Sequence, residues 1–421
     1  MKVLWIINLI PRKAAAQMGI RSSNKEGWVA GALDALKEYG SEDMTLGLAF
    51  PVKSEDPMHG KIDGIYYFGF SEDSSHPEKY DPALEASLGL ILEEFRPDVI
   101  EIFGTEFPHC LACLKVSEWR DRVVIHLQGI MRKCADVYLA DLPSNITERA
   151  TFRDVLRSDS LKKQKEKYES RAANEEETIK LVKHVCGRTA FDKEFVSGLN
   201  PECNYYSLNE TLRSCFYGKA WNKEKRGRNI VMTQGNIPLK GAHVMLKAMP
   251  LILKRFPDAT LTIAGDNILK GSGPVAAMKR CGYGRYLHKL AKDPAIRDCV
   301  EFTGSLRAED LLELYLDSDV FVLPSFVENS PNSLGEAMLL GLPCVACETG
   351  GIPSMAKKDE EALLVPPGDE KALAEAVIKI FENEEFAANL AMAGRKRAML
   401  TFDRQANIKM LMWIYDQICG K

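Results

Sequence analysis

The sequence predicts an α/β protein built from two Rossmann-like domains, each a parallel sheet covered by helices. Strand-length apolar runs alternate with helical segments along the chain, which is typical of a parallel sheet with helices on both faces. The same alternation starts again near residue 228. A chain of 421 residues is also long enough to form two separate cores.

The composition is that of an ordinary globular protein, with 46% hydrophobic and 27% charged residues. The formal net charge is -4, so no overall basic field indicates a nucleic-acid partner. The longest apolar runs, such as Val3–Ile7, have the length of a strand and do not reach the length of a membrane-spanning helix. We find no signal-peptide pattern at the N-terminus, and the expected location is the cytoplasm.

In the N-terminal half, apolar β-branched runs predict strands at Val3–Ile7, Asp98–Phe103 and Arg122–Leu127, and a helical pattern covers Gly27–Glu38. A charge-rich helical stretch follows between Ile146 and His184. Its charges nearly cancel, which favours a solvated helical surface. A membrane-surface or acceptor-binding role for this stretch stays open.

In the C-terminal half the same reasoning predicts a second set of strands and helices. The expected strands are Asn229–Thr233, Ala259–Ala264, Val300–Gly304, Asp319–Leu323, Leu342–Cys347 and Ala362–Val365. The expected helices are Ala242–Phe256, Ala308–Asp317, Asn332–Leu340, Glu385–Met399 and Arg404–Ile418. Periodicity breaks between Tyr206 and Lys225, so the join between the domains is expected there.

The segment most suggestive of chemistry follows the predicted strand that ends at Leu323. It reads Glu328-Asn-Ser-Pro-Asn-Ser-Leu-Gly-Glu336, and a helix is expected to begin at Pro331 or Asn332. Open α/β sheets bind ligands at the carboxyl ends of their strands, where the N–H groups of a helix N-terminus can receive a diphosphate. From the residues alone, we infer a nucleotide or phosphate ligand. Two ordinary surface glutamates are the simpler alternative.

This segment resembles the Glu-x7-Glu motif of glycosyltransferase family 4. The likeness continues in Gly341-Leu-Pro-Cys-Val-Ala346, in Gly350-Gly-Ile-Pro353, in Val365-Pro-Pro-Gly368 and in Gly304 after a strand. These matches occur in the family's order over most of residues 228–370. The resemblance implies the GT-B fold, in which two Rossmann-like domains face each other across a cleft. It also implies a retaining transfer of sugar from a nucleoside diphosphate sugar, with no metal and no other cofactor.

Carried over residue by residue, the resemblance implies a donor site on the second domain. Glu336 would bind the donor ribose, and Glu328 would contact the transferred sugar and support positive charge at its anomeric carbon. Gly304 would lie near the base. The diphosphate would be held around Asn329, Ser330, Asn332, Ser333 and Leu334.

A second cluster, Thr233-Gln-Gly-Asn-Ile-Pro-Leu-Lys-Gly241, resembles the family's diphosphate loop. Its Lys240 would neutralise the leaving nucleoside diphosphate, beside Gly235 and Asn236. An exposed lysine is the alternative for Lys240 considered alone. The family usually carries arginine where this chain has Asn236, and Arg188 and Arg307 are candidates to replace that cation.

The N-terminal half matches the family more weakly. Gly27, in Glu26-Gly27-Trp28, resembles the glycine that lets the backbone approach the donor phosphates. Gln128 and Gly129 occupy the place of the family's His-Gly, so Gln128 would bind acceptor or sugar hydroxyls. Arg188 lies in a segment common in bacterial polysaccharide enzymes and is assigned to acceptor binding. A structural ion pair with Asp192 is its alternative.

The resemblance implies an N-terminal acceptor domain of residues 1–210, a donor domain of residues 211–402, and a final helix, about residues 403–421, that packs back on the first domain. The expected acceptor is a carbohydrate or lipid-linked hydroxyl, in surface polysaccharide or glycoconjugate synthesis. A peripheral contact with the inner face of the membrane through the N-terminal domain is a further expectation. A catalytically idle GT-B protein that binds nucleotide sugar or acts as a scaffold remains the alternative.

Two further patterns are interpreted as structural. The 11 cysteines include the pairs Cys110/Cys113 and Cys344/Cys347, which no histidine cluster accompanies, so they are expected to be buried thiols. Asp317-Ser-Asp319 has the spacing of a metal motif, but it joins a helix to a buried strand. We therefore interpret it as a helix end and a turn, with no metal site predicted.

Overall fold

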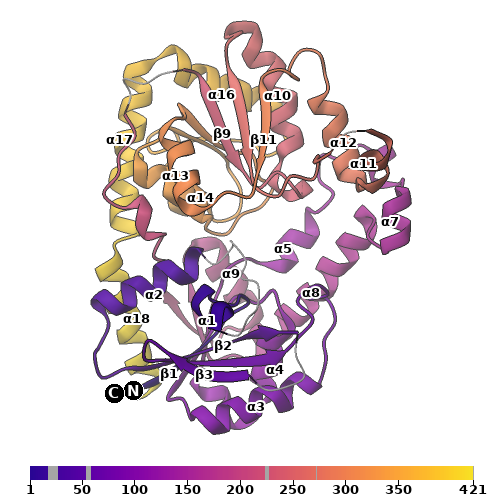
Figure 1. Ribbon diagram of the computed structural model, residues 1–421. Helices are drawn as coiled ribbons and strands as arrows, with labels where there is room; N and C mark the ends of the chain where they lie inside the picture. Colours follow the sequence, from indigo (N-terminus) through magenta and orange to yellow (C-terminus); the bar gives the residue numbers. More distant parts are fainter. Residues whose placement is uncertain (18–26, 54–57, 223–226, 272, 421) are drawn as a thin grey trace. The chain divides into compact units, whose positions relative to one another are not determined.

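A computed structural model describes residues 1–17, 27–53, 58–222, 227–271 and 273–420. The chain divides into two compact units, and Figure 1 follows it from the N-terminus to the C-terminus. The first unit comprises residues 1–135, 167–213 and 402–421, and the second comprises residues 136–166 and 214–401. The domain division predicted from the sequence placed residues 136–166 with the N-terminal part, whereas their contacts group them with the second unit.

The described part of the first unit is built on an eight-stranded sheet with the order β3-β4-β2-β1-β5-β6-β7-β8. Its neighbours pair in parallel except β3 and β4, which are antiparallel. The strands are β1 (Lys2–Ile6), β2 (Thr45–Val52), β3 (Met58–Ile62), β4 (Ile65–Ser71), β5 (Val99–Phe103), β6 (Val123–His126), β7 (His184–Gly187) and β8 (Asn204–Ser207).

Helices cover the sheet of the first unit. They are α1 (Arg12–Gln17), α2 (Gly27–Tyr39), α3 (Ala83–Phe95), α4 (Pro108–Lys115), the 3₁₀ turn η1 (Ser117–Arg122), α5 (Met131–Asp136), α8 (Leu161–Leu181), α9 (Ala190–Leu199) and α18 (Arg404–Ile418). The terminal helix α18 lies beside α2 (Figure 1) and contacts the central strand, because Trp5 Nε1 donates to the Tyr415 hydroxyl at 2.8 Å. Helices α5 and α8 cross the boundary between the two units.

The described part of the second unit is built on a six-stranded, all-parallel sheet with the order β11-β10-β9-β12-β13-β14. Its strands are β9 (Asn229–Thr233), β10 (Thr260–Ala264), β11 (Val300–Gly304), β12 (Val320–Leu323), β13 (Cys344–Cys347) and β14 (Leu363–Val365). The strands β9 and β11 have the bounds predicted from the sequence. Along the sheet, the chain runs from β9 through β10 to β11 on one side and from β12 through β13 to β14 on the other. The neighbours β9 and β12 therefore form the topological switch point of the sheet.

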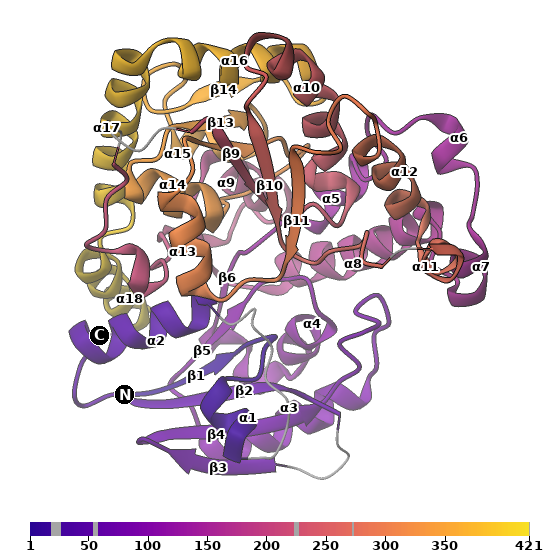
Figure 2. The ribbon, with the colours of Figure 1, turned by 45° about the horizontal axis from the view of Figure 1, so that its top comes forward.

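The second unit has helices on both faces of its sheet and further helices that lie beyond its edge (Figure 2). They are α6 (Ser144–Thr147), α7 (Phe152–Arg157), η2 (Ser214–Phe216), η3 (Pro238–Lys240), α10 (Ala242–Arg255), α11 (Gly273–Lys279), α12 (Gly282–Ala291), α13 (Ala308–Leu316), α14 (Asn332–Leu340), α15 (Ile352–Met355), α16 (Glu370–Glu382) and α17 (Glu384–Thr401). Asp369 caps α16, since its carboxylate accepts the N–H groups of Lys371 and Ala372.

The two cysteine pairs and the segment Asp317-Ser-Asp319, which we interpreted as structural, both lie in structural positions. The cysteine pairs are buried, one in α4 and one in β13. Asp319 is 2% exposed, and its Oδ2 accepts the backbone N–H groups of Gly227 at 3.0 Å and Asn229 at 2.7 Å. It therefore joins the start of β9 to the start of β12. Within the described ranges, no helix is both long and apolar enough to cross a membrane.

Candidate active site

The candidate site lies on the second unit at its switch point. Lys240 follows β9 through the 3₁₀ turn η3, and Glu328 follows β12 through a polar loop. These strands are neighbours and parallel, so their carboxyl ends lie at the same edge of the sheet. Ligands of open α/β sheets bind at such a point, because the loops leave it in opposite directions. Two residues 88 positions apart in the sequence therefore meet there.

The centre of the site is an ion pair between Lys240 and Glu328. The Nζ of Lys240 donates to Oε1 of Glu328 at 2.7 Å, and the hydroxyl of Ser325 donates to the same oxygen at 2.7 Å. The Lys240 side chain keeps 20% of its surface exposed and that of Glu328 keeps 9%. An ammonium group has three N–H donors, so Lys240 can hold Glu328 and still bind an anionic ligand. The prediction from the sequence did not include Ser325.

Two glycines allow the backbone segments that carry Lys240 and Glu328 to lie close to their neighbours. A Cβ on Gly241 would lie 1.9 Å from the carbonyl oxygen of Pro324, and a Cβ on Gly350 would lie 2.0 Å from that of Glu328. Both glycines have positive φ, +69° and +54°, a region that other residues enter only with strain. The N–H of Gly351 also donates to the Glu328 carbonyl at 2.9 Å. The glycine loop after β13 thus fixes the backbone that presents Glu328.

Replacing Gly350 with alanine is expected to lower the free energy of unfolding by about 2–4 kcal/mol, because backbone strain and a backbone clash act together. Chemical denaturation with circular dichroism measures this change. Gly218→Ala is the matched control, because Gly218 also has positive φ, +75°, but its Cβ would have no neighbour within 4 Å. The control should lose only about 1 kcal/mol. Equal losses in the two variants would mean that close packing against Glu328 contributes nothing.

The helix α14 begins at Asn332, as predicted, with Pro331 at its N-cap and no side-chain cap. The residues expected to hold a diphosphate gather around this start. Asn329 and Ser330 are buried in the loop, Leu334 is fully buried, and Asn332 and Ser333 are partly exposed. Glu336 lies on the second turn of α14 and is 3% exposed. The N-terminus of a helix carries partial positive charge, which favours an anion at this position.

Other predicted donor residues also lie at the carboxyl edge of this sheet. Gly304 ends β11 with φ of +84°, and a Cβ there would meet no atom within 4 Å. Gly235 follows β9, and a Cβ there would lie 2.8 Å from Ile263 Cγ2. Asn236 lines a small cavity with Asp159, Gln164, Cys281 and Tyr283. Arg307, a candidate replacement for the missing cation, forms two hydrogen bonds of 2.9 Å with Asp310 on an exposed surface.

In the first unit, Gln128 and Gly129 follow β6, and Arg188 follows β7. The guanidinium of Arg188 pairs with Glu210 at 3.1 Å and donates to the carbonyl oxygens of Leu127 at 3.1 Å and Gln128 at 2.8 Å. The side-chain amide of Gln128 also donates to Glu210. Arg188 is therefore almost fully buried, with 3% of its side chain exposed, and it holds the Gln128 backbone in place.

The alternative pairing of Arg188 with Asp192 is wrong. Asp192 instead forms a capping box with Thr189 at the start of α9, and it accepts the backbone N–H of Arg188 at 2.9 Å. A helix N-terminus leaves N–H groups that need acceptors, and a carboxylate at this position supplies one. Glu210, which takes the guanidinium, was not predicted. Gly27 begins α2, whereas its neighbour Glu26 lies outside the described residues.

Two buried carboxylates lie near Gly129. The pKa of Glu106 is raised by burial, against an opposing hydrogen bond from the Gly129 backbone. Burial raises the pKa of Glu175 to about 7, although Thr105 and the N–H groups of Met131 and Arg132 donate to it. Burial therefore favours the protonated, neutral form of both carboxyl groups. Sequence reasoning missed both glutamates.

Residues 219–397 match the family described as glycosyl transferases group 1. The chain is also similar to the amylovoran biosynthesis glycosyltransferase AmsK of Erwinia amylovora, with 29% identity over 168 residues, 38% of this chain and 41% of AmsK. The chain therefore spans less than half the length of this relative.

Among solved structures, the chain resembles sucrose-phosphate synthase from Thermosynechococcus elongatus, with a TM-score of 0.71, 16% identity and 100% of both chains covered. It also resembles Anabaena HepE in complex with UDP-glucose, with a TM-score of 0.67, 16% identity, and 99% of this chain and 100% of HepE covered. At such identities the likeness concerns the fold. Residues 219–397 therefore resemble the group 1 glycosyl transferases, and the two parallel-sheet α/β units have the GT-B fold.

Proposed function

We propose that the protein is a retaining, metal-independent glycosyltransferase. It would move a sugar from a nucleoside diphosphate sugar to a hydroxyl of a carbohydrate or lipid-linked acceptor, in surface polysaccharide or glycoconjugate synthesis. The observation that carries the proposal is the Lys240–Glu328 pair at 2.7 Å, at the switch point of the second unit. It lies in the segment that matches the group 1 family. Support for the donor class comes from HepE, whose structure contains UDP-glucose.

We assign the donor as follows. The ribose hydroxyls bind the carboxylate of Glu336, the diphosphate lies at the N-terminus of α14, and Lys240 donates to its outer phosphate. The transferred sugar then lies against Glu328. Glu328 is anchored by Ser325 and Lys240, so its carboxylate is already oriented toward the charge that develops at the anomeric carbon.

In the proposed reaction, the bond between the anomeric carbon and the phosphate oxygen breaks, and a bond forms from the same face to the acceptor oxygen. The acceptor proton passes to a leaving phosphate oxygen, so no protein group needs to act as nucleophile or base. Lys240 stabilises the charge that accumulates on the leaving diphosphate. The remaining contribution of the protein is to position the two substrates and to exclude water.

We place the acceptor near Gln128 and Gly129 of the first unit. Arg188 would then act as a positioning residue, since its guanidinium holds the carbonyl oxygens of Leu127 and Gln128. We also propose that the protein works in the cytoplasm, at the inner face of the membrane. The name of AmsK, which refers to amylovoran biosynthesis, supports polysaccharide synthesis as the setting.

A two-step experiment tests the proposal. A thermal-shift screen with UDP, GDP and ADP should find one nucleotide that raises Tm, since a ligand at 100 times its Kd stabilises a protein by about 2.7 kcal/mol. The matching nucleotide sugar should then be hydrolysed slowly without acceptor, releasing sugar of the donor's anomeric configuration as seen by NMR. Excess EDTA should leave this rate unchanged.

Each other outcome has a defined meaning. Nucleotide binding without hydrolysis or transfer would support a non-catalytic, nucleotide-sugar-binding role, for which Asn236 in place of the family's arginine is the motivating difference. A rate lost in EDTA and restored by a divalent cation would contradict metal independence. If no nucleotide raises Tm, the donor site assigned to the second unit is wrong.

A further inference from the structure

Two short helices of the second unit, α7 and α11, present apolar side chains to solvent. Phe152, Val155 and Leu156 of α7 are 61%, 69% and 70% exposed, and Val275 and Met278 of α11 are 65% and 54% exposed. Their spacings place each set on one face of its helix. The two helices contact each other, and Figures 1 and 2 both show them side by side. These five residues are called the α7–α11 patch below.

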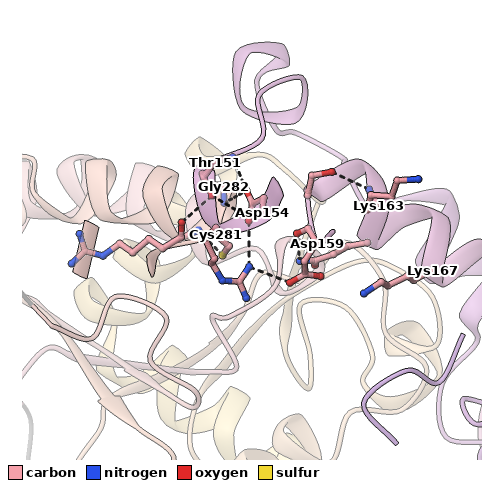
Figure 3. A network of polar contacts seen from close by, with 12 residues as sticks. Thr151, Asp154, Asp159, Lys163, Lys167, Cys281 and Gly282 are labelled. Carbon is pink, nitrogen blue, oxygen red and sulfur yellow. Dashed lines mark hydrogen bonds and ion pairs between the residues drawn. The ribbon is translucent and has the colours of Figure 1, made fainter. Parts of the chain in front are cut away.

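Helix α7 has its polar side inward. Asp154 is 2% exposed, and its Oδ2 accepts the N–H groups of Thr151 and Gly282, each at 3.0 Å (Figure 3). The Thr151 hydroxyl donates to the carbonyl of Arg280 at 3.2 Å. A surface helix of a globular protein normally buries its apolar face and exposes its polar one. Here polar anchoring to the start of α12 holds the apolar face of α7 outward.

Helix α11 has no buried residue, yet the segment around it is tied down. Arg280 directly follows the helix and is 7% exposed. Its guanidinium donates to the carbonyl oxygens of Leu269 at 3.2 Å and Gly271 at 2.7 Å, just before the helix. The two ends of the segment are therefore joined. Because both helices are anchored by buried polar groups, the apolar side chains of the patch are held on the surface by the fold.

Basic side chains outnumber acidic ones in the segments that carry the patch. Arg149 and Arg157 flank α7 and are exposed, whereas Asp154 between them is buried. The exposed Glu148 pairs with Lys162. From residue 270 to residue 289 the sequence has no aspartate or glutamate. The exposed basic residues of that segment are Lys270, Lys279, Arg285 and Lys289. This local excess stands out in a chain of net charge -4, and it gives the patch the charge complementary to an anionic surface.

We propose that the α7–α11 patch docks the protein on an anionic lipid bilayer. The apolar side chains enter the boundary between headgroups and acyl chains, and the flanking arginines and lysines face the lipid phosphates. A second copy of the chain fits less well, because a two-fold contact through this patch would bring two positive rims together. The proposal locates membrane contact on the second unit, and it does not depend on the transfer activity.

Vesicle flotation with the full chain tests the proposal. The wild-type protein should float with vesicles of phosphatidylglycerol and phosphatidylcholine in equal parts, and not with vesicles of phosphatidylcholine alone. Binding should weaken as salt rises, because salt screens the attraction between basic side chains and lipid phosphates. Equal binding to the neutral vesicles, or no binding to the anionic ones at low salt, would overturn the proposal.

The variant Phe152→Ser/Val155→Ser/Leu156→Ser should reduce the partition coefficient by about tenfold or more, since it removes most of the apolar area available for insertion. The matched control is Met392→Ser/Met399→Ser/Leu400→Ser on α17, whose side chains are 67%, 56% and 73% exposed. This control should bind vesicles like the wild type. All of these side chains are exposed, so both variants should keep the wild-type Tm.

A charge variant, Arg157→Gln/Lys279→Gln, should bind anionic vesicles more weakly and with a shallower salt dependence. Equal losses in the α7 variant and the α17 control would overturn the assignment to this patch. Sedimentation of the wild type gives a last check. Self-association that the α7 variant abolishes, without vesicle binding, would make the patch an interface between copies and would also overturn the proposal.

Discussion

Replacing Lys240 with alanine is expected to lower kcat for sugar transfer by about 10²–10³-fold, with a smaller change in KM. The Nζ of Lys240 lies 2.7 Å from Glu328, at the edge of the sheet where the diphosphate would leave. Negative charge on the diphosphate grows as its bond to sugar breaks, so a cation there stabilises the transition state more than the bound donor. Steady-state kinetics with the donor found by nucleotide screening measures the effect.

Two comparisons make this test specific. Lys254→Ala removes an exposed lysine from the far end of α10 and should leave kcat unchanged. The double variant Lys240→Ala/Glu328→Gln should lose less than the two single losses combined, because the residues form one pair. A Lys240→Ala variant with unchanged kcat and a raised KM would mean that Lys240 only binds the donor, equally in the ground and transition states.

The second unit could be predicted closely from the sequence. The strands β9 and β11 and the helix α14 have the expected bounds. The strand β9 is a short, buried apolar run, whereas β11 is a partly exposed edge strand whose end is marked by Gly304. The start of α14 could be placed because proline is favoured next to a helix N-terminus. Such local signals are strong where a strand is buried on both faces.

Five strands of the first unit, β2, β3, β4, β7 and β8, were not predicted. The signal for the β3–β4 hairpin is nevertheless present, since Asp63-Gly64 joins two alternating runs, and both residues have positive φ, 51° and 85°. That pair is typical of a two-residue hairpin turn. The grouping of residues 136–166 with the second unit has no such local signal. It depends on contacts such as that of Thr151 with Arg280, 129 positions away.

The candidate site could also be predicted only in part. The residues around Glu328 could be named from the sequence, but their geometry could not. The contact of Lys240 with Glu328 requires the close approaches at Gly241 and Gly350, which are set by tertiary packing. The ion pair of Arg188 with the nearby Asp192, which was the structural alternative for this residue, does not form. The carboxylate of Asp192 caps the N-terminus of α9, and the guanidinium of Arg188 binds the more distant Glu210.

Substitutions at Glu336 and Glu328 are expected to affect different steps, nucleotide binding at Glu336 and sugar transfer at Glu328. Glu336→Ala should weaken binding of the nucleoside diphosphate by about 10–100-fold, because a hydrogen bond to a charged group contributes about 1.5–3 kcal/mol. Glu336 is 3% exposed, so alanine also leaves a cavity and lowers the Tm of the free protein. The informative quantity is therefore the rise in Tm that nucleotide produces in each variant. Glu336→Gln, which keeps the volume, should lose much of that rise too.

Glu328→Gln is the contrasting variant. It keeps an oxygen that can accept from Ser325 and Lys240 but removes the charge that we propose faces the transferred sugar. The nucleotide-induced rise in Tm should stay at the wild-type value, because the nucleoside diphosphate lacks the transferred sugar. Its kcat for transfer should fall by about 10²–10³-fold, since a fixed carboxylate no longer supports the positive anomeric carbon. If Glu328→Gln abolished nucleotide binding, or if Glu336→Ala left it unchanged, the roles of the two glutamates would have to be reassigned.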